Sequence, residues 1–346
     1  MDKKLVGLID KALSRRSFLA GSSSAAVVMF AGCGGSSTPT PTTTTTPTPT
    51  TAPTPTTTAA PPAYMDTDYL NFALNLEYLE AEFYLRAATG SGLSATDTGN
   101  ASTTVVVPST TQVPGLTTVQ KNYIYEIAQN ELDHVRFLRS ALGSGAVSRP
   151  NLDLMNSFNA AASAAGIGSS FNPFASYEAF LVGAFTFEDV GVTAYLGAAG
   201  ALSNTTTGKT YLAAAAAIMG VEAYHAGEVR SLIIADSIAT ASTTSSMVTP
   251  NDTYVNYANK ISALRGTLGG GNETQLTALP PYPVPLVPAS YMPASSIVAA
   301  NSSSVGYARS TDQVLHIVYA TANGAGVKGG GFFPNGMNGN ITVTYS

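Results

Sequence analysis

The chain has 346 residues and a formal net charge of −5; 45% of its residues are hydrophobic and 11% are charged. This length allows one large domain or two small ones with a sizeable core. The acidic balance, without a basic stripe, argues against nucleic acid as a partner and is compatible with cation binding. The single cysteine excludes an intrachain disulfide and a cysteine-rich metal site.

Residues 1–32 are predicted to be a signal peptide. A basic start leads to residues 14–19, which read SRRSFL, and then to a mildly apolar run that ends near Ala31. This run is shorter than the roughly 20 residues that a membrane helix needs. The arginine pair followed by Phe-Leu resembles a twin-arginine signal, with an ordinary secretory signal as the alternative. We therefore expect export to the bacterial periplasm or cell envelope.

Cys33 lies where a bacterial lipobox would end. Residues 30–33 read FAGC, in which Phe30 departs from the usual leucine. Lipidation of Cys33 would make the membrane a partner through a lipid anchor, whereas a plain cleavage nearby would release a soluble protein. Residues 33–63 consist largely of Thr and Pro and are predicted to be a disordered tether.

Residues 64–270 contain four long segments with the apolar periodicity of helices. We predict helices at about 68–88, 117–142, 176–199 and 209–238, with a glycine soon after each of the first three. These lengths are typical of a long-helix bundle. A fifth helix is expected at about 253–265, and a short one at about 151–165 within the connection between the second and third helices.

Residues 271–346 are predicted to be a C-terminal extension that packs on the bundle. A proline-rich stretch at 280–293 leads to Val314–Tyr319 and Ile341–Tyr345, which are rich in β-branched residues and roughly alternating. Both are predicted to be short strands. His316 lies in the first of them, and we interpret it as a structural histidine.

Two predicted helices carry the same local arrangement, Glu-x-x-His. It occurs as Glu131 with His134 and as Glu222 with His225. A spacing of three residues places the carboxylate and the imidazole on one helical face, one turn apart. Each pair can therefore bind one metal ion from one helix.

The other two long helices each carry a glutamate on the apolar face, Glu77 in the first and Glu188 in the third. Glu80 lies three residues after Glu77 and is an alternative to it, or an outer partner. Each glutamate is followed seven residues later by a tyrosine, Tyr84 or Tyr195, on the same face. The tyrosines can donate hydrogen bonds to the carboxylates or act as redox groups, but we favour core aromatics.

Nearby charged residues have less specific interpretations. Asp133, Arg136 and Arg230 are candidates for orienting the ligands, and surface charge is equally compatible with them. Glu82 is expected to point into solvent, and Glu126 is expected to face away from Glu131.

Four carboxylates and two imidazoles are the ligand set of a dinuclear site in a bundle core. Two divalent cations bring four positive charges into a low-dielectric interior, where four carboxylates offset them and neutral imidazoles complete the coordination. The absence of thiolates disfavours sulfur-ligated metals. We therefore predict two metal ions, with iron favoured and manganese as the alternative.

Five stretches carry a resemblance to a known family: LNLEYLEAEFYL (74–85), ELDHVRFLRSAL (131–142), FEDVGVTAYLGAA (187–199), VEAYHAGEVR (221–230) and GGFFPNGMNG (330–339). The sequence resembles the ferritin-like superfamily, in the branch of plant desiccation-related proteins and their bacterial, exported relatives. The resemblance implies a mainly α fold, an antiparallel four-helix bundle with a long crossover between its second and third helices. It also implies a set of metal ligands, with Glu131 and Glu222 as bridges: Glu77, Glu131, His134, Glu188, Glu222 and His225.

The leading functional hypothesis is a di-iron or di-manganese oxidoreductase that acts on O₂, peroxide or Fe(II) in stress protection. The alternative is a non-catalytic, desiccation-type envelope protein in which the metals are structural or a partner is bound. An iron-storage cage is disfavoured because the tether and the C-terminal extension would obstruct close packing. A homodimer is a compatible assembly.

Overall fold

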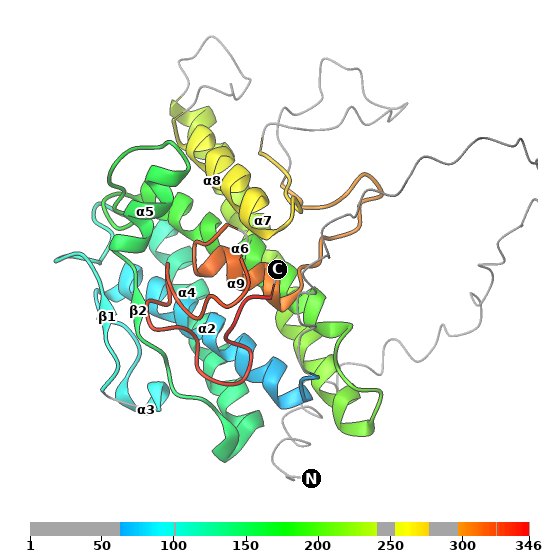
Figure 1. Cartoon of the computed structure of the whole chain (residues 1–346). Helices are drawn as coiled ribbons and strands as arrows, with labels where there is room; N and C mark the ends of the chain where they lie inside the picture. Colours follow the sequence, from blue (N-terminus) through cyan, green and yellow to red (C-terminus); the bar gives the residue numbers. More distant parts are fainter. Residues whose placement is uncertain (1–62, 100–101, 241–252, 277–296, 323, 346) are drawn as a thin grey trace, which may run out of the picture. The chain divides into compact units, whose positions relative to one another are not determined.

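The computed structural model describes residues 63–99, 102–240, 253–276, 297–322 and 324–345. The predicted signal peptide, Cys33, nearly all of the tether and the proline-rich stretch lie outside these residues. The described part is mainly helical, with long helices packed side by side and short elements around them (Figure 1).

The four longest described helices form the bundle: α2 (Asp66–Thr89), α4 (Thr118–Leu142), α6 (Tyr177–Ala199) and α7 (Thr206–Thr240). α2 packs chiefly against α4, and α6 packs chiefly against α7. Arg139 in α4 contacts Tyr78, whereas Gly145, just past the end of α4, contacts Asn71 nearer the start of α2. The first pair is therefore antiparallel. Residues 200–205 are too short a connection for α7 to return to the start of α6, so the second pair is antiparallel as well.

The two pairs are joined by a long crossover, residues 143–176, which confirms the predicted fold class. The crossover contains η2 (Gly143–Gly145), β2 (Leu152–Asp153) and α5 (Asn156–Ala164). β2 pairs in parallel with β1 (Val105–Val106) from the α2–α4 connection, which also contains α3 (Ala95–Thr98). The predicted fifth helix is α8 (Thr253–Gly269).

Local sequence signals set the helix ends. Thr117 caps α4 through a capping box with Gln120, and the Ser176 hydroxyl accepts a hydrogen bond from the Ala179 N–H at the start of α6. Gly90 ends α2 in the left-handed conformation, with φ of 80°, where its N–H donates to the Arg86 carbonyl. These signals explain why the predicted helix ends fall within a few residues of the observed ones.

The core lies between the helix pairs and is rich in aromatic rings. Phe83 of α2 stacks on Phe180 of α6 with ring centroids 5.5 Å apart, and Phe187 meets Phe83 edge-on at 5.4 Å. Among the described helices, α6 is long and apolar enough to cross a membrane, but 89% of its apolar stretch is buried inside the bundle. α6 is therefore the central core helix of this fold.

The predicted strand at Val314–Tyr319 is wrong, because this segment forms helix α9 (Thr311–Val318). Ser310 and Gln313 form a capping box that starts the helix. Residues 314–319 are all buried, and a short, continuously buried apolar run does not distinguish a strand from a helix by periodicity. The predicted strand at Ile341–Tyr345 is also wrong, because this segment belongs to no helix or strand of the described structure.

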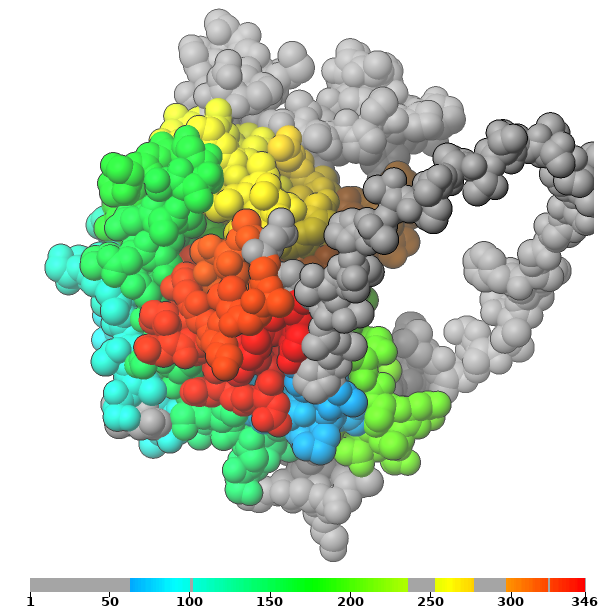
Figure 2. Space-filling model, in the orientation of Figure 1, coloured from blue at the N-terminus to red at the C-terminus, as the bar shows by residue number. Residues whose placement is uncertain are grey.

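The described part of the C-terminal extension packs along the bundle. α9 contacts α6 and α8, and Asn338 exchanges two hydrogen bonds with Asn75 of α2 (2.8 and 2.9 Å). Gly336 has φ of 85°, and a Cβ there would lie 2.1 Å from the Lys328 carbonyl oxygen, so the chain turn requires glycine. Figure 2 shows the orange and red atoms of this segment covering the middle of one face.

Glu82 is not solvated, contrary to the sequence-based expectation. Its side chain is fully buried and forms ion pairs with Arg149 of the crossover and, at 2.9 Å, with Arg86 one turn later in α2. Arg149 is itself buried and also donates to the Thr103 carbonyl. The Glu82–Arg149 pair therefore ties the crossover to the first bundle helix.

We predict that Arg149→Met destabilises the protein by about 3 kcal/mol, because it removes the buried cation that faces the buried Glu82 carboxylate. Urea unfolding of the two proteins measures this difference. The same substitution at Arg136, whose side chain is 52% exposed, is the matched control. It should cost no more than about 1 kcal/mol. Equal losses from the two substitutions would contradict a special role for the buried pair.

Candidate metal centre

The six predicted ligands converge at the centre of the bundle. α2 contributes Glu77, α4 contributes Glu131 and His134, α6 contributes Glu188, and α7 contributes Glu222 and His225. The four carboxylates are at most 1% exposed, and the two imidazoles are at most 8% exposed. The rings of the two histidines lie 6.3 Å apart, centroid to centroid. The sequence order Glu, Glu-x-x-His, repeated twice, therefore corresponds to one buried cluster.

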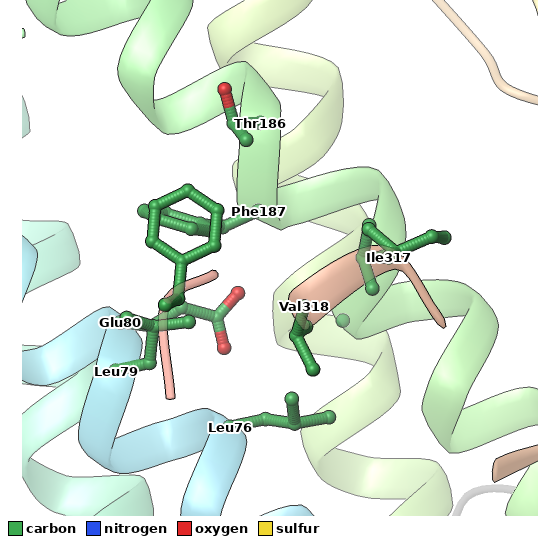
Figure 3. A pocket seen from close by; sticks show the side chains of 10 residues that line it. Leu76, Leu79, Glu80, Thr186, Phe187, Ile317 and Val318 are labelled. Carbon is green, nitrogen blue, oxygen red and sulfur yellow. The ribbon is translucent and has the colours of Figure 1, made fainter. Parts of the chain in front are cut away.

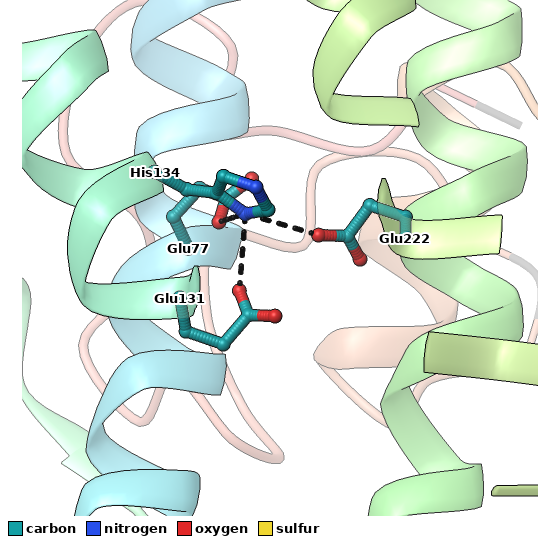
Figure 4. A group of neighbouring side chains, drawn as sticks. All are labelled: Glu77, Glu131, His134 and Glu222. Carbon is teal, nitrogen blue, oxygen red and sulfur yellow. Dashed lines mark hydrogen bonds and ion pairs between the residues drawn. The ribbon is translucent and has the colours of Figure 1, made fainter. Parts of the chain in front are cut away.

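His134 lies among the carboxylates of Glu77, Glu131 and Glu222 (Figure 4). Its Nδ1 atom is 3.1 Å from Glu77 Oε2, 3.4 Å from Glu131 Oε2 and 3.2 Å from Glu222 Oε1. Glu222 reaches these residues from α7, across the bundle from α2 and α4. One ligand atom from each of the four residues lies within 4.8 Å of the others, so the group can hold one ion.

His225 lies at the opposite end of the site from His134, with ring centroids 6.3 Å apart. Its Nδ1 atom is 2.9 Å from Glu131 Oε1 and 3.7 Å from Glu188 Oε2, and these three residues form a second group with metal-ligand spacing. Two ligands that each bind an ion at about 2.0–2.2 Å can lie up to about 4.4 Å apart, which is the scale of these groups. Because Glu131 belongs to both groups, it lies where a bridging ligand is needed.

Glu80 joins the cluster together with Glu77 and does not replace it. Glu77 faces His134, whereas Glu80 forms a third group with Glu188 and Glu222. Glu222 thus belongs both to this third group and to the group around His134. It therefore lies between the two ends of the site. The cluster contains five buried carboxylates, one more than the sequence analysis assigned.

The two tyrosines are core aromatics that also bind the cluster, and they do so crosswise. The Tyr84 hydroxyl of α2 donates a hydrogen bond to Glu188 of α6, and the Tyr195 hydroxyl of α6 donates one to Glu77 of α2. Both rings lie in the hydrophobic core. Such bonds fix the orientation of carboxylates that could bind metal.

Asn130 is a polar partner that the sequence analysis missed. Its side-chain oxygen lies 3.0 Å from His225 Nε2, so the imidazole can donate its Nε2–H to Asn130 and leave Nδ1 free for a metal. A polar residue directly before a Glu-x-x-His motif is the only signal that the sequence offered.

The three residues proposed to orient the ligands behave differently. Arg230 is buried, donates to Asp189 at 2.7 Å and lies over the Phe185 ring, so it stabilises the α6–α7 pair next to the cluster. The side chains of Asp133 and Arg136 are 59% and 52% exposed. These two residues therefore contribute surface charge, the alternative interpretation, and do not orient the ligands.

The incompletely hydrogen-bonded atoms of the cluster provide a test of whether a metal fits. Several buried atoms make no hydrogen bond of normal geometry: both carboxylate oxygens of Glu131 and of Glu222, Glu188 Oε2, and His225 Nδ1. Histidine nitrogens lie 2.9–3.4 Å from three of these oxygens as ion-pair contacts. Buried polar atoms that are not fully hydrogen-bonded are costly, and here they belong to one compact cluster. Two cations would satisfy them, and the oxygen and nitrogen donors suit iron or manganese. The residues therefore fit a dinuclear metal site.

Electrostatics also indicate that the cluster needs compensating charge. Burial raises the pKa of Glu131 to about 8, and burial together with repulsion from Glu131 raises the pKa of Glu222 to about 8. Burial raises the pKa of Glu80 and Glu188 far above the ordinary value, with repulsion from Glu222 adding to it. Without metal, the cluster therefore retains protons that a bound cation would displace.

We predict that Tyr195→Phe lowers metal affinity about 10–100-fold, because the Glu77 carboxylate loses the hydrogen bond that orients it. Competition with a chelator of known affinity measures the change. Tyr125→Phe on α4 is the control, since that side chain is 47% exposed and should not change the affinity. An unchanged affinity in the Tyr195 variant would show that the hydroxyl does not support the site.

The raised carboxyl pKa values predict a pH dependence of stability. Glu131 and Glu222 have pKa values of about 8 in the folded, metal-free protein, against an ordinary value of 4.5, so that protein loses stability as pH rises through about 8. Bound cations replace the protons and remove this loss. Calorimetry should therefore show a larger increase in Tm on metal loading at about pH 8.5 than at about pH 6. An equal increase at both pH values would contradict the assignment.

Comparison with known proteins agrees with this architecture. The sequence matches the ferritin-like domain family over residues 65–235, which include all the residues of the cluster. It is 27% identical to the ferritin-like catalase Nec2 of Nesocodon mauritianus over 288 residues, which cover 80% of this chain and 84% of that relative.

A second relative is the desiccation-related protein PCC13-62 of Craterostigma plantagineum. The two are 30% identical over 212 residues, which cover 59% of this chain and 62% of that relative, less than two thirds of its length. The family match, the two relatives and the bundle agree. The chain belongs to the ferritin-like superfamily, in the branch that contains the desiccation-related proteins.

Proposed function

We propose that this protein is an exported oxidoreductase that consumes hydrogen peroxide at a dinuclear iron or manganese centre. The observation that carries the proposal is the buried cluster of five carboxylates and two imidazoles with atoms that are not fully hydrogen-bonded. Among the reactions open to such a centre, the relative named as a ferritin-like catalase favours peroxide over Fe(II) or O₂. The balanced reaction is the conversion of two H₂O₂ into two H₂O and one O₂.

The charge of the cluster supports a redox role. Two divalent ions carry four positive charges and two trivalent ions carry six, whereas the five carboxylates Glu77, Glu80, Glu131, Glu188 and Glu222 carry five negative charges when ionised. Neither oxidation level would therefore leave more than one net charge in the dry interior. A metal pair that cycles between these levels can accept and return two electrons, which is the chemistry that peroxide conversion needs.

The chain's own residues would hold and shield this centre. Glu131 and Glu222 lie between the two ends of the cluster, and the two tyrosines fix the outer carboxylates. Gly191 lets the backbone of α6 approach the carboxylates closely, because a Cβ there would lie 2.5 Å from Glu222 Oε2 and 3.3 Å from Glu80 Oε1.

The place of action is part of the same proposal. The twin-arginine-type signal, lipidation at Cys33 and the 33–63 tether would hold the bundle at the cell envelope, where external peroxide arrives first. A twin-arginine route would export the bundle already folded, so that its metals could be bound in the cytoplasm.

A second candidate function is non-catalytic, and the desiccation-related relative favours it. In that case the metals would only neutralise the buried carboxylates and stabilise the bundle in the drying envelope. Metal removal would then lower Tm, while the metal-loaded protein would show no peroxide turnover.

We predict that Glu131→Ala lowers peroxide consumption per chain by more than about a hundredfold, because it removes a group shared by both ends of the site. Oxygen evolution and elemental analysis of the same samples measure activity and metal content. Glu126→Ala, five residues earlier on the exposed side of α4, is the matched control and should retain both. Metal-loaded wild-type protein without oxygen evolution would favour the non-catalytic alternative.

A further inference from the structure

A small cavity lies against the metal centre, at the seam of α2, α6 and α9. The centre of a water-sized sphere can occupy about 20 Å³ of this cavity. The cavity therefore has room for roughly one molecule of that size. The lining comes from three parts of the chain: Leu76, Leu79 and Glu80 of α2; Thr186, Phe187, Val190 and Gly191 of α6; and Ile317, Val318 and Phe332 of the C-terminal extension.

Glu80 is the charged group of this lining. Figure 3 shows its carboxylate pointing into the space toward Ile317 and Val318. The side chain is 4% exposed, and Glu80 also belongs to the group with Glu188 and Glu222 that could hold a metal ion. The cavity therefore lies directly beside a candidate metal ligand.

The cavity borders the carboxylate cluster. Glu80 lines the cavity and also forms a group of metal-ligand spacing with Glu188 and Glu222. Gly191 lines the cavity as well, and its backbone packs tightly against the cluster, because a Cβ there would lie 2.5 Å from Glu222 Oε2 and 3.3 Å from Glu80 Oε1.

The outer wall is formed by the C-terminal extension. The Phe332 N–H donates to the Val318 carbonyl at 2.9 Å, and the Asp153 N–H of β2 donates to the Phe332 carbonyl at 3.1 Å. The Phe332 ring also packs edge-on against Phe187 at 4.9 Å. Backbone hydrogen bonds and ring packing therefore hold this wall at a fixed distance from Glu80.

We propose that this cavity is the route and binding position through which hydrogen peroxide reaches the metals, and that the C-terminal extension sets the size limit for the reactant. The inference rests on the proposed function. An apolar wall favours small neutral molecules and disfavours hydrated cations, which would lose hydration without replacement. The narrow volume excludes organic peroxides that carry a bulky alkyl group.

Val318 tests the proposal, with Val314 as the matched control. Both are buried valines of α9, but Val314 does not line the cavity. In metal-loaded protein, Val318→Leu should lower the rate constant for H₂O₂ at least about tenfold, since one methylene in a tight pocket has effects of about 10–200-fold. Val318→Ala should raise the rate with tert-butyl hydroperoxide at least about tenfold. The corresponding Val314 variants should match the wild type in both assays.

Xenon binding gives a second readout that needs neither metal nor turnover. Crystals under xenon pressure should show xenon in the cavity of wild type and of Val314→Leu, and none there in Val318→Leu. Unchanged H₂O₂ rates in Val318→Leu at equal metal content, or xenon absent from the wild-type cavity, would overturn the proposal. If xenon binds as expected but the wild type does not convert peroxide, the proposed function fails, and the assignment of this cavity to peroxide fails with it.

Discussion

The structure depends on one constraint, the placement of five carboxylates in an interior that water does not reach. Burial favours protonation of these groups, and it raises the pKa values of Glu80, Glu131, Glu188 and Glu222. At Glu77 the neighbouring His134 outweighs burial and lowers the pKa. Bound cations would reverse this tendency, because they would convert mutual repulsion into shared coordination. The oxygen and nitrogen atoms that are not fully hydrogen-bonded in the metal-free cluster are those that coordination would satisfy.

The surrounding fold holds these groups in place from two sides. Each helix pair supplies a glutamate from one helix and a Glu-x-x-His pair from the other, and the tyrosines connect the pairs crosswise from α2 to α6 and back. Buried ion pairs such as Glu82–Arg149 and Asp189–Arg230 fix the crossover and the second helix pair around the site. The C-terminal extension then closes the seam beside Glu80. The candidate ligands thus have a rigid frame, with a small apolar cavity beside Glu80.

Much of the fold and the main residues of the site could be predicted from sequence, since helical periodicity and a spacing of three residues are local properties. The crosswise tyrosine bonds could not, because spacing shows which face a side chain occupies but not which neighbouring helix it meets. Glu82 was misplaced because its partner, Arg149, is distant in sequence. The sequence of α9 favours a strand because it is rich in β-branched residues. The Ser310–Gln313 capping box, which favours a helix start, is the signal that identifies it as a helix.

The most direct measurement of the central claim is anomalous diffraction from crystals of protein purified with its native metal, recorded at the iron and manganese absorption edges. The account predicts two peaks about 3.5–4 Å apart, both within ligand distance of Glu131 and Glu222, with His134 beside one and His225 beside the other. Protein that folds and crystallises with no metal among these carboxylates, their oxygens paired through shared protons, would contradict it.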